Sequence, residues 1–198
     1  MTDDAAEDLI ARIVQGDRDA FTLLYRRFRP DVYRFAAHIC GSTAHAEDVV
    51  QDVFIAVIQH ASRYRAERSG VLAWLLGIAR NHARRRRHER PTLPLPVDDG
   101  PSVRELTVDA DPVAGIARDR RAAALRQALR ELPDRYRDVI VLCDLHDLTY
   151  LDAAAALGCA IGTVRSRLHR GRALLGRLLS NAEQPPIAPR LPIRRPVL

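Results

Sequence analysis

The stretch LTYLDAAAALGCAIGTVRSRLHRGRALL, residues 148–175, decides how the rest of the chain is interpreted. It predicts two short helices joined by a tight turn, with Thr149 and Asp152 placed as a capping box at the start of the first. Gly158 fits the left-handed backbone that the turn requires, and four alanines before it allow the following helix to approach closely. The second helix has arginines on one side and apolar residues on the other, which is the layout of a helix-turn-helix.

The composition favours a polyanionic partner. The 198 residues include 31 basic and 25 acidic side chains, and a net charge of +6 suits phosphates because neutralising them releases counterions. Every basic residue is Arg, which suits bidentate phosphate and guanine contacts but is equally explained by genomic base composition. The length and the 47% hydrophobic content favour two small packed domains.

Three widely spaced cysteines, Cys40, Cys143 and Cys159, and an acidic N-terminus without a secretory signal predict a reduced cytoplasmic protein. No apolar run approaches the roughly 20 residues that span a bilayer, so no membrane insertion is expected. His38 with Cys40 and Cys143 with His146 have ligand-like spacing but lack a Cys-x-x-Cys partner. Buried cysteines are the simpler interpretation, and neither a metal nor a cofactor is predicted.

Residues 1–90 are predicted to form an all-helical first domain. Apolar periodicity predicts two helices over residues 5–28, interrupted at Gly16, and a third that restarts at Pro30. The next helix, AHAEDVVQDVFIAVIQH, has an acidic face that is either a solvated surface or a docking surface. Its expected apolar face consists of Val49, Val50, Val53, Phe54, Val57 and Ile58.

The last helix of this domain, VLAWLLGIARNHARRRRHER, begins apolar and ends basic. Arg80, Arg84 and Arg87 fall on one stripe with Asn81 beside it. A charge run is often only a solvated face, but arginines on a helix that packs by its other side favour nucleic-acid contact. Trp74 is expected to pack in the core.

Residues 91–112 are Pro-rich and acidic, which predicts a semi-stiff linker. The second domain covers residues 113–180, and its helix DRYRDVIVLCDLH is expected to turn Tyr136 inward and to expose Arg135 and Arg137. Residues 181–198 are predicted to be a disordered tail. The expected fold class is therefore all-α, with two small helical domains and a C-terminal helix-turn-helix.

Five segments in this order resemble the extracytoplasmic-function (ECF) sigma factors, the smallest members of the sigma-70 family of bacterial transcription initiation subunits. The resemblance covers nearly all of residues 10–178 and implies a non-enzymatic protein that binds core RNA polymerase and promoter DNA, with an anti-sigma factor as its usual inhibitor. The segments are DAFTLLYRRFRPDVYRFA, AEDVVQDVFIAV, AWLLGIARNHARRRR, LRELPDRYRDVIVL and LTYLDAAAALGCAIGTVRSRLHRGRALL.

The resemblance assigns the acidic helix of the first domain to polymerase docking through Asp48, Gln51 and Asp52, with Phe54 nearby. The SRYRAERSG loop and the basic helix after it resemble the part that captures and opens the minus-ten promoter element. That task needs a base-edge donor and cations for a single strand, and Tyr64 either stacks on a base or anchors the loop. The minus-ten candidates are Tyr64, Arg80, Asn81, Arg84 and Arg85.

The second helix of the helix-turn-helix resembles the family's reader of the minus-thirty-five element, which enters the major groove. Arg165, Ser166, His169 and Arg170 are the base-edge candidates that the resemblance implies. Contacts to phosphate are implied for Thr163, Arg167, Arg135 and Arg137.

A dimeric helix-turn-helix regulator is the main alternative, and it would bind its operator without polymerase. That alternative has no use for the basic helix and the acidic docking face of the first domain. An enzyme is disfavoured because the sequence has no Gly-rich phosphate loop, no zincin His-Glu pairing and no nucleophile elbow.

Overall fold

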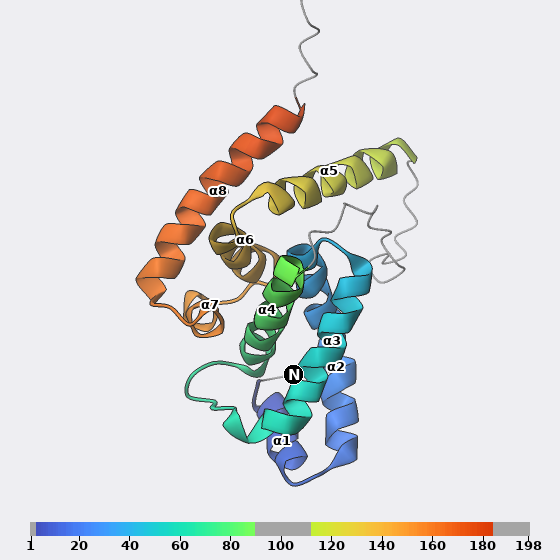
Figure 1. The fold of residues 1–198 in the computed structure, drawn as a ribbon, viewed down its shortest axis with the longest axis vertical. Helices are drawn as coiled ribbons and strands as arrows, with labels where there is room; N and C mark the ends of the chain where they lie inside the picture. Colours follow the sequence, from blue (N-terminus) through green and yellow to red (C-terminus); the bar gives the residue numbers. More distant parts are fainter. Residues whose placement is uncertain (1–2, 90–111, 184–198) are drawn as a thin grey trace, which may run out of the picture.

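The computed structural model describes residues 3–89 and 112–183. Within these ranges every regular element is helical, which confirms the all-α prediction. The helices form two groups, and α4 of the first group lies against the second group (Figure 1). One continuous hydrophobic core runs through both groups, so their packing is shared.

The first group contains α1 (Asp3–Val14), α2 (Arg18–Cys40), α3 (Thr43–His60) and α4 (Val71–Glu89). A short 3-10 turn, Ala61–Arg63, and a loop join α3 to α4. Asp17 caps α2 by accepting hydrogen bonds from the backbone N–H groups of Asp19 and Ala20. Helix α2 ends at Gly41, whose left-handed backbone (φ 69°) lets the chain turn into α3.

The prediction of a helix break at Pro30 is wrong, because α2 is continuous through it. Pro30 lacks the N–H that an interior helical residue donates, but it lies on the exposed side of α2. Buried residues flank it on one stripe, and Phe28 and Val32 are 5% and 0% exposed. Burial of this stripe on both sides outweighs the local loss of one hydrogen bond.

The second group contains α5 (Pro112–Glu131), α6 (Asp134–Ile140), α7 (Tyr150–Leu157) and α8 (Ile161–Glu183). A π-helical turn, Val141–Leu145, extends α6. Helix α8 continues beyond residue 180, so it includes the first residues of the predicted tail. The rest of that tail, and the predicted linker up to residue 111, lie outside the described residues.

The helix-turn-helix prediction is confirmed by the geometry of α7 and α8. Thr149 accepts a hydrogen bond from the backbone N–H of Asp152 at 3.1 Å, and Gly158 is left-handed (φ 64°). Val164 and Leu168 of α8 are buried. The alanine run also allows close packing against a helix that the sequence did not indicate. Ala156 lies against Gly77 of α4.

The two groups also meet at two places that involve residues between helices. The rings of Phe35 on α2 and His146 after the π-helical turn lie 5.8 Å apart in an edge-on arrangement. The backbone N–H of Gly70 donates a hydrogen bond to the Asp152 carboxylate at 3.2 Å. No helix in the described ranges has both the length and the apolar character that a bilayer crossing requires.

Candidate nucleic-acid interface

Helix α8 lies at the outer side of the second group, away from α2 and α3 (Figure 1), and most of its arginines are exposed. It rests on α6 at Gly171, where an added Cβ would lie 3.0 Å from the end of the Ile140 side chain. This close approach leaves the opposite face of α8 open, in the manner of a major-groove reader. Arg165, Ser166, His169 and Arg170 are exposed, while Thr163 and Arg167 are half-buried.

Two arginines at or near this face each lie over the ring of a tyrosine. The Arg165 guanidinium lies 5.9 Å from the ring of Tyr150, and the Arg135 guanidinium lies 4.8 Å from the ring of Tyr136. Hydrogen bonding from Arg135, and to a lesser extent from Arg170, lowers the pKa of Tyr136. Tyr136 was expected inside the core but is half-buried, and its position between two arginines arises only when α6 meets α8.

Arg137 corrects the predicted set of phosphate contacts. It was expected to be exposed, but it is 1% exposed and donates hydrogen bonds to the backbone carbonyls of Leu129, Arg130 and Leu132. The first two carbonyls lie in the last turn of α5 and the third directly follows it, so the guanidinium caps that helix from inside the fold. The predicted exposure of Arg137 is therefore wrong, and its guanidinium is not available for a phosphate contact in this structure.

The loop between α3 and α4 is anchored by Tyr64. Its hydroxyl donates to the Ser69 carbonyl at 3.0 Å, and its ring lies 5.4 Å from that of Trp74. This arrangement favours loop anchoring over base stacking, the two alternatives that the sequence left open. Trp74, expected in the core, is only half-buried and lines a groove.

This groove, of about 990 Å³, lies between the α3–α4 loop with α4 on one side and the α7–α8 turn on the other. Exposed Asn81 reaches it from α4. Three loop arginines that sequence reasoning did not single out also line it, although the SRYRAERSG segment already showed their density. They are Arg63, Arg65 and Arg68.

Three of the α4 arginines face carboxylates of α6. Arg80 Nε lies 2.6 Å from an oxygen of Asp138, and Arg84 lies 4.0 Å from the same oxygen. Arg87 contacts Asp134 at 2.7 Å. The side chain of Arg80 is 14% exposed, whereas Arg85 is exposed. The predicted minus-ten candidates therefore differ in how accessible they are to a ligand.

The acidic face of α3 is also tied to α4. Arg86 lies 2.7 Å from Asp48 and 2.7 Å from Asp52, and these bonds raise the pKa of Arg86. Gln51 is exposed between them. The predicted docking carboxylates therefore both pair with one arginine of α4, in partly exposed ion pairs that are individually weak.

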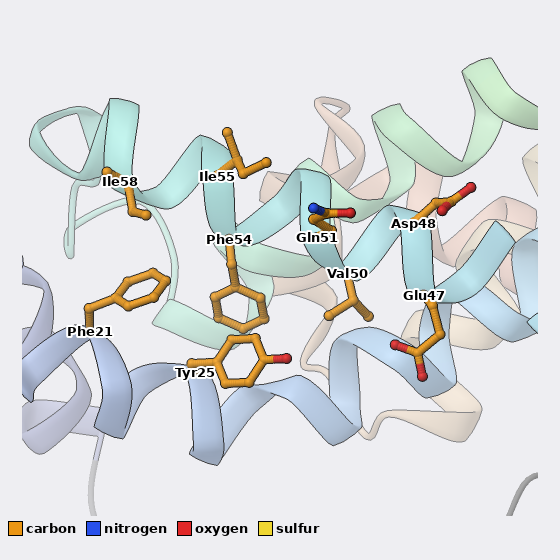
Figure 2. Close-up of a pocket in the computed structure, with 9 residues that line it drawn as sticks. All are labelled: Phe21, Tyr25, Glu47, Asp48, Val50, Gln51, Phe54, Ile55 and Ile58. Atoms are coloured by element: carbon orange, nitrogen blue, oxygen red, sulfur yellow. The ribbon is translucent and has the colours of Figure 1, made fainter. Parts of the chain in front are cut away.

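An apolar groove of about 530 Å³ adjoins these carboxylates. Figure 2 shows Phe54 pointing from α3 toward Tyr25 of α2, and their rings lie 4.7 Å apart. Phe54 is 3% exposed and forms the groove floor, so it contributes shape rather than a projecting contact. Ile58, expected in the core, is 62% exposed at the groove's end, and Ile55 is 44% exposed.

Comparison with known proteins gives a consistent result. Residues 24–90 match the sigma-70 region 2 family, and residues 122–175 match the sigma-70 region 4 family. The chain is 35% identical over 176 residues to the ECF RNA polymerase sigma factor SigM of Mycobacterium tuberculosis, covering 87% of this chain and 83% of SigM. It is 29% identical over 178 residues to the ECF sigma factor SigW of Bacillus subtilis, covering 86% and 94%.

Two solved structures resemble it. CnrH in complex with the cytosolic domain of CnrY is 27% identical, with a TM-score of 0.67 over 91% of this chain and 99% of CnrH. The sigma factor RpoE of Bartonella quintana in complex with the anti-sigma factor NepR is 29% identical, with a TM-score of 0.57 over 76% and 91%.

Proposed function

The chain belongs to the ECF sigma factors of the sigma-70 family, and from this membership we propose how its surfaces share the work of transcription initiation. As a sigma factor it binds core RNA polymerase and directs it to promoters. The first domain, residues 1–90, docks on polymerase and holds the minus-ten strand. The second domain, residues 113–180, reads the minus-thirty-five element.

The α3 face is the proposed polymerase contact. Asp48, Gln51 and Asp52 supply charge for steering and register, and the adjoining apolar groove over Phe54 supplies buried area. The α4 and loop side of this groove, around Asn81, is the proposed minus-ten site, with Arg80, Arg84 and Arg85 on the strand backbone. Tyr64 supports this site by anchoring its loop.

On the second domain, Arg165, Ser166, His169 and Arg170 are the proposed base-edge contacts, and Thr163, Arg167 and Arg135 the proposed phosphate contacts. The single observation that carries the proposal is that one chain exposes both this polar face of α8 and the α3 face. A dimeric regulator that acts alone would have no use for the second. We place the protein in the cytoplasm, with polymerase and promoter DNA, and propose an anti-sigma partner because RpoE has one.

Reconstituted transcription tests the proposal. The purified chain is added to core RNA polymerase with a genomic promoter library, and we expect transcripts from specific start sites. Changing Asp48 and Gln51 to alanine should abolish them, whereas Asp19→Ala, an exposed carboxylate on α2, should not. Strong DNA binding by the free chain without any stimulation of polymerase would refute the sigma-factor assignment.

A further inference from the structure

Asp144 and Arg172 form a fork-shaped ion pair within the second domain. Asp144 lies in the π-helical turn after α6, and Arg172 lies on α8. The Arg172 Nε donates to one carboxylate oxygen at 3.0 Å, and its Nη2 donates to the other at 2.5 Å. Both oxygens are therefore engaged by one guanidinium, in the bidentate geometry that arginine favours with carboxylates.

The ion pair contributes little to the fold by itself. The side chain of Arg172 is 57% exposed and that of Asp144 is 26% exposed, so water screens their attraction. Helix α8 is already held against α6 beside this pair, because buried Gly171 lies against Ile140 and Tyr136. Stability is thus a weak reason for the pair, and its position on α8 suggests another.

Arg172 belongs to the same stripe of α8 as two of the proposed base readers. Arg165, His169 and Arg172 stand at positions i, i+4 and i+7, which a helix places on one side. All three residues are exposed. Arg165 lies 5.9 Å from the neutral ring of Tyr150, whereas Arg172 faces the full negative charge of a carboxylate.

A paired arginine and a free arginine bind duplex DNA differently. A free arginine contacts phosphate in any sequence, and each such contact adds about 0.9 to the slope of log affinity against log salt. These contacts hold a protein on DNA but carry no sequence information. A paired arginine must first leave its carboxylate, which would then face the phosphates and repel them.

We propose that Asp144 restrains the sequence-independent affinity of α8 for duplex DNA, by keeping Arg172 off the phosphates. The affinity that remains then comes from Arg165 and the other base-edge contacts, so the free chain holds an arbitrary duplex weakly. A repulsive element of this kind acts against wrong partners rather than for the right one. The proposal rests on the proposed function, because it takes α8 as the helix that enters duplex DNA.

Binding of the free chain to random-sequence DNA tests the proposal. The probe is a fluorescein-labelled duplex of random sequence, because a phosphate contact is independent of base identity. Asp144→Asn keeps the size of the side chain and removes its charge. At about 0.1 M salt we expect it to bind the probe roughly threefold to eightfold more tightly than wild type, with a salt slope steeper by about 0.9.

The matched control is Asp147→Asn. Asp147 is an exposed carboxylate in the same connection between α6 and α7, and its left-handed backbone (φ 52°) suits asparagine as well as aspartate. This variant changes the net charge equally without releasing Arg172, so its salt slope should match that of wild type. Equal slopes in the two asparagine variants, or weaker binding by Asp144→Asn, would overturn the proposal.

Variants of the arginine approach the same question from the other side. Adding Arg172→Ala to Asp144→Asn should return both affinity and salt slope to the wild-type values. Arg172→Ala alone leaves Asp144 unpaired, and it should weaken probe binding while the slope stays at the wild-type value. A gain that survives Arg172→Ala, or a shallower slope in Arg172→Ala alone, would show that the proposal is wrong.

No polymerase is present in these measurements, so their results are separable from the transcription test. A chain that is active with polymerase but whose Asp144→Asn variant matches wild type loses only this proposal. A chain whose Asp144→Asn variant shows the gain but which never stimulates polymerase loses only the sigma-factor assignment.

Discussion

Three arginines, Arg137, Arg80 and Arg165, have different roles, and burial decides among these roles. Arg137 is enclosed and bonds to carbonyls, Arg80 is paired across the domain boundary, and Arg165 is open to solvent. The same side chain therefore acts as a helix cap, an interdomain ion pair or a candidate base reader. Replacing each of these arginines by alanine is therefore expected to have a different effect on stability or on promoter binding.

Arg137→Ala should lower the free energy of unfolding by about 3 kcal/mol, because three carbonyls at the end of α5 lose a buried charged donor. Urea unfolding followed by circular dichroism measures the loss. Arg135→Ala, two residues earlier and exposed, is the control and should leave stability nearly unchanged while weakening promoter binding. Similar stabilities for the two variants would contradict the capping role.

Arg165→Ala should weaken promoter binding by about 1–3 kcal/mol if the side chain reads a guanine. Binding is measured with the polymerase holoenzyme on a promoter from the library and on copies with single base changes in the minus-thirty-five element. If Arg165 reads a base, its substitution should weaken binding to the original promoter but have little effect on the copy in which that one base is changed. Equal losses on all templates would mean that Arg165 touches phosphate alone.

His146 predicts a dependence of stability on pH. Burial lowers the pKa of His146 from 6.5 to about 4, so the unfolded chain binds more protons than the folded chain between these values. Its contribution is complete above pH 6.5 and is lost as the pH falls toward 4, by up to about 3 kcal/mol. The charged groups around it are Asp31, Arg34, His38 and Asp147.

His146→Phe should keep the edge-on contact with Phe35 and remove this loss. The measurement is the free energy of unfolding in urea at several pH values from 7 to 4, for both proteins. Below pH 6.5, the free energy of unfolding should fall more steeply with decreasing pH for the wild type than for the variant. Parallel curves would show that His146 is as solvated in the folded chain as in the unfolded one.

At the scale of an element, α2 shows how tertiary packing overrides a local signal. Pro30→Ala restores a backbone donor at an exposed position inside a helix, and it should raise the free energy of unfolding by about 2 kcal/mol. The gain is smaller than the full helix propensity difference, because alanine also gives the unfolded chain more freedom. Thermal unfolding measures it, and a lower melting temperature would indicate that the proline ring makes a needed contact.

At the scale of the whole molecule, the packing of α4 against α6 and α7 predicts a compact free protein. Small-angle X-ray scattering of wild type and Gly77→Ala should give the same radius of gyration, while Gly77→Leu and Asp138→Asn should give a larger one. The segments outside the helices are common to all four proteins and cancel in the comparison. Superimposable curves for all of them would show that neither contact holds the domains together.

Much of the candidate site follows from local patterns. The period of α8 places Val164 and Leu168 inside and the arginines outside, and the Thr149 cap and Gly158 turn are visible in the sequence because each depends only on nearby residues. The expectations about Arg137, Ile58 and Trp74 were wrong for the opposite reason. Each depends on which other element covers that face, which periodicity alone does not tell.

The sequence by itself determined the all-α class, the helix-turn-helix and the family, because side-chain period, capping residues and motif order are local properties. Only the tertiary structure decided which charges are available. Whether Arg80 meets water or Asp138 depends on the packing of α4 against α6 and α7, between residues 58 positions apart. Burial changes the electrostatic environment of such a pair, and burial is a property of the folded chain rather than of its letters.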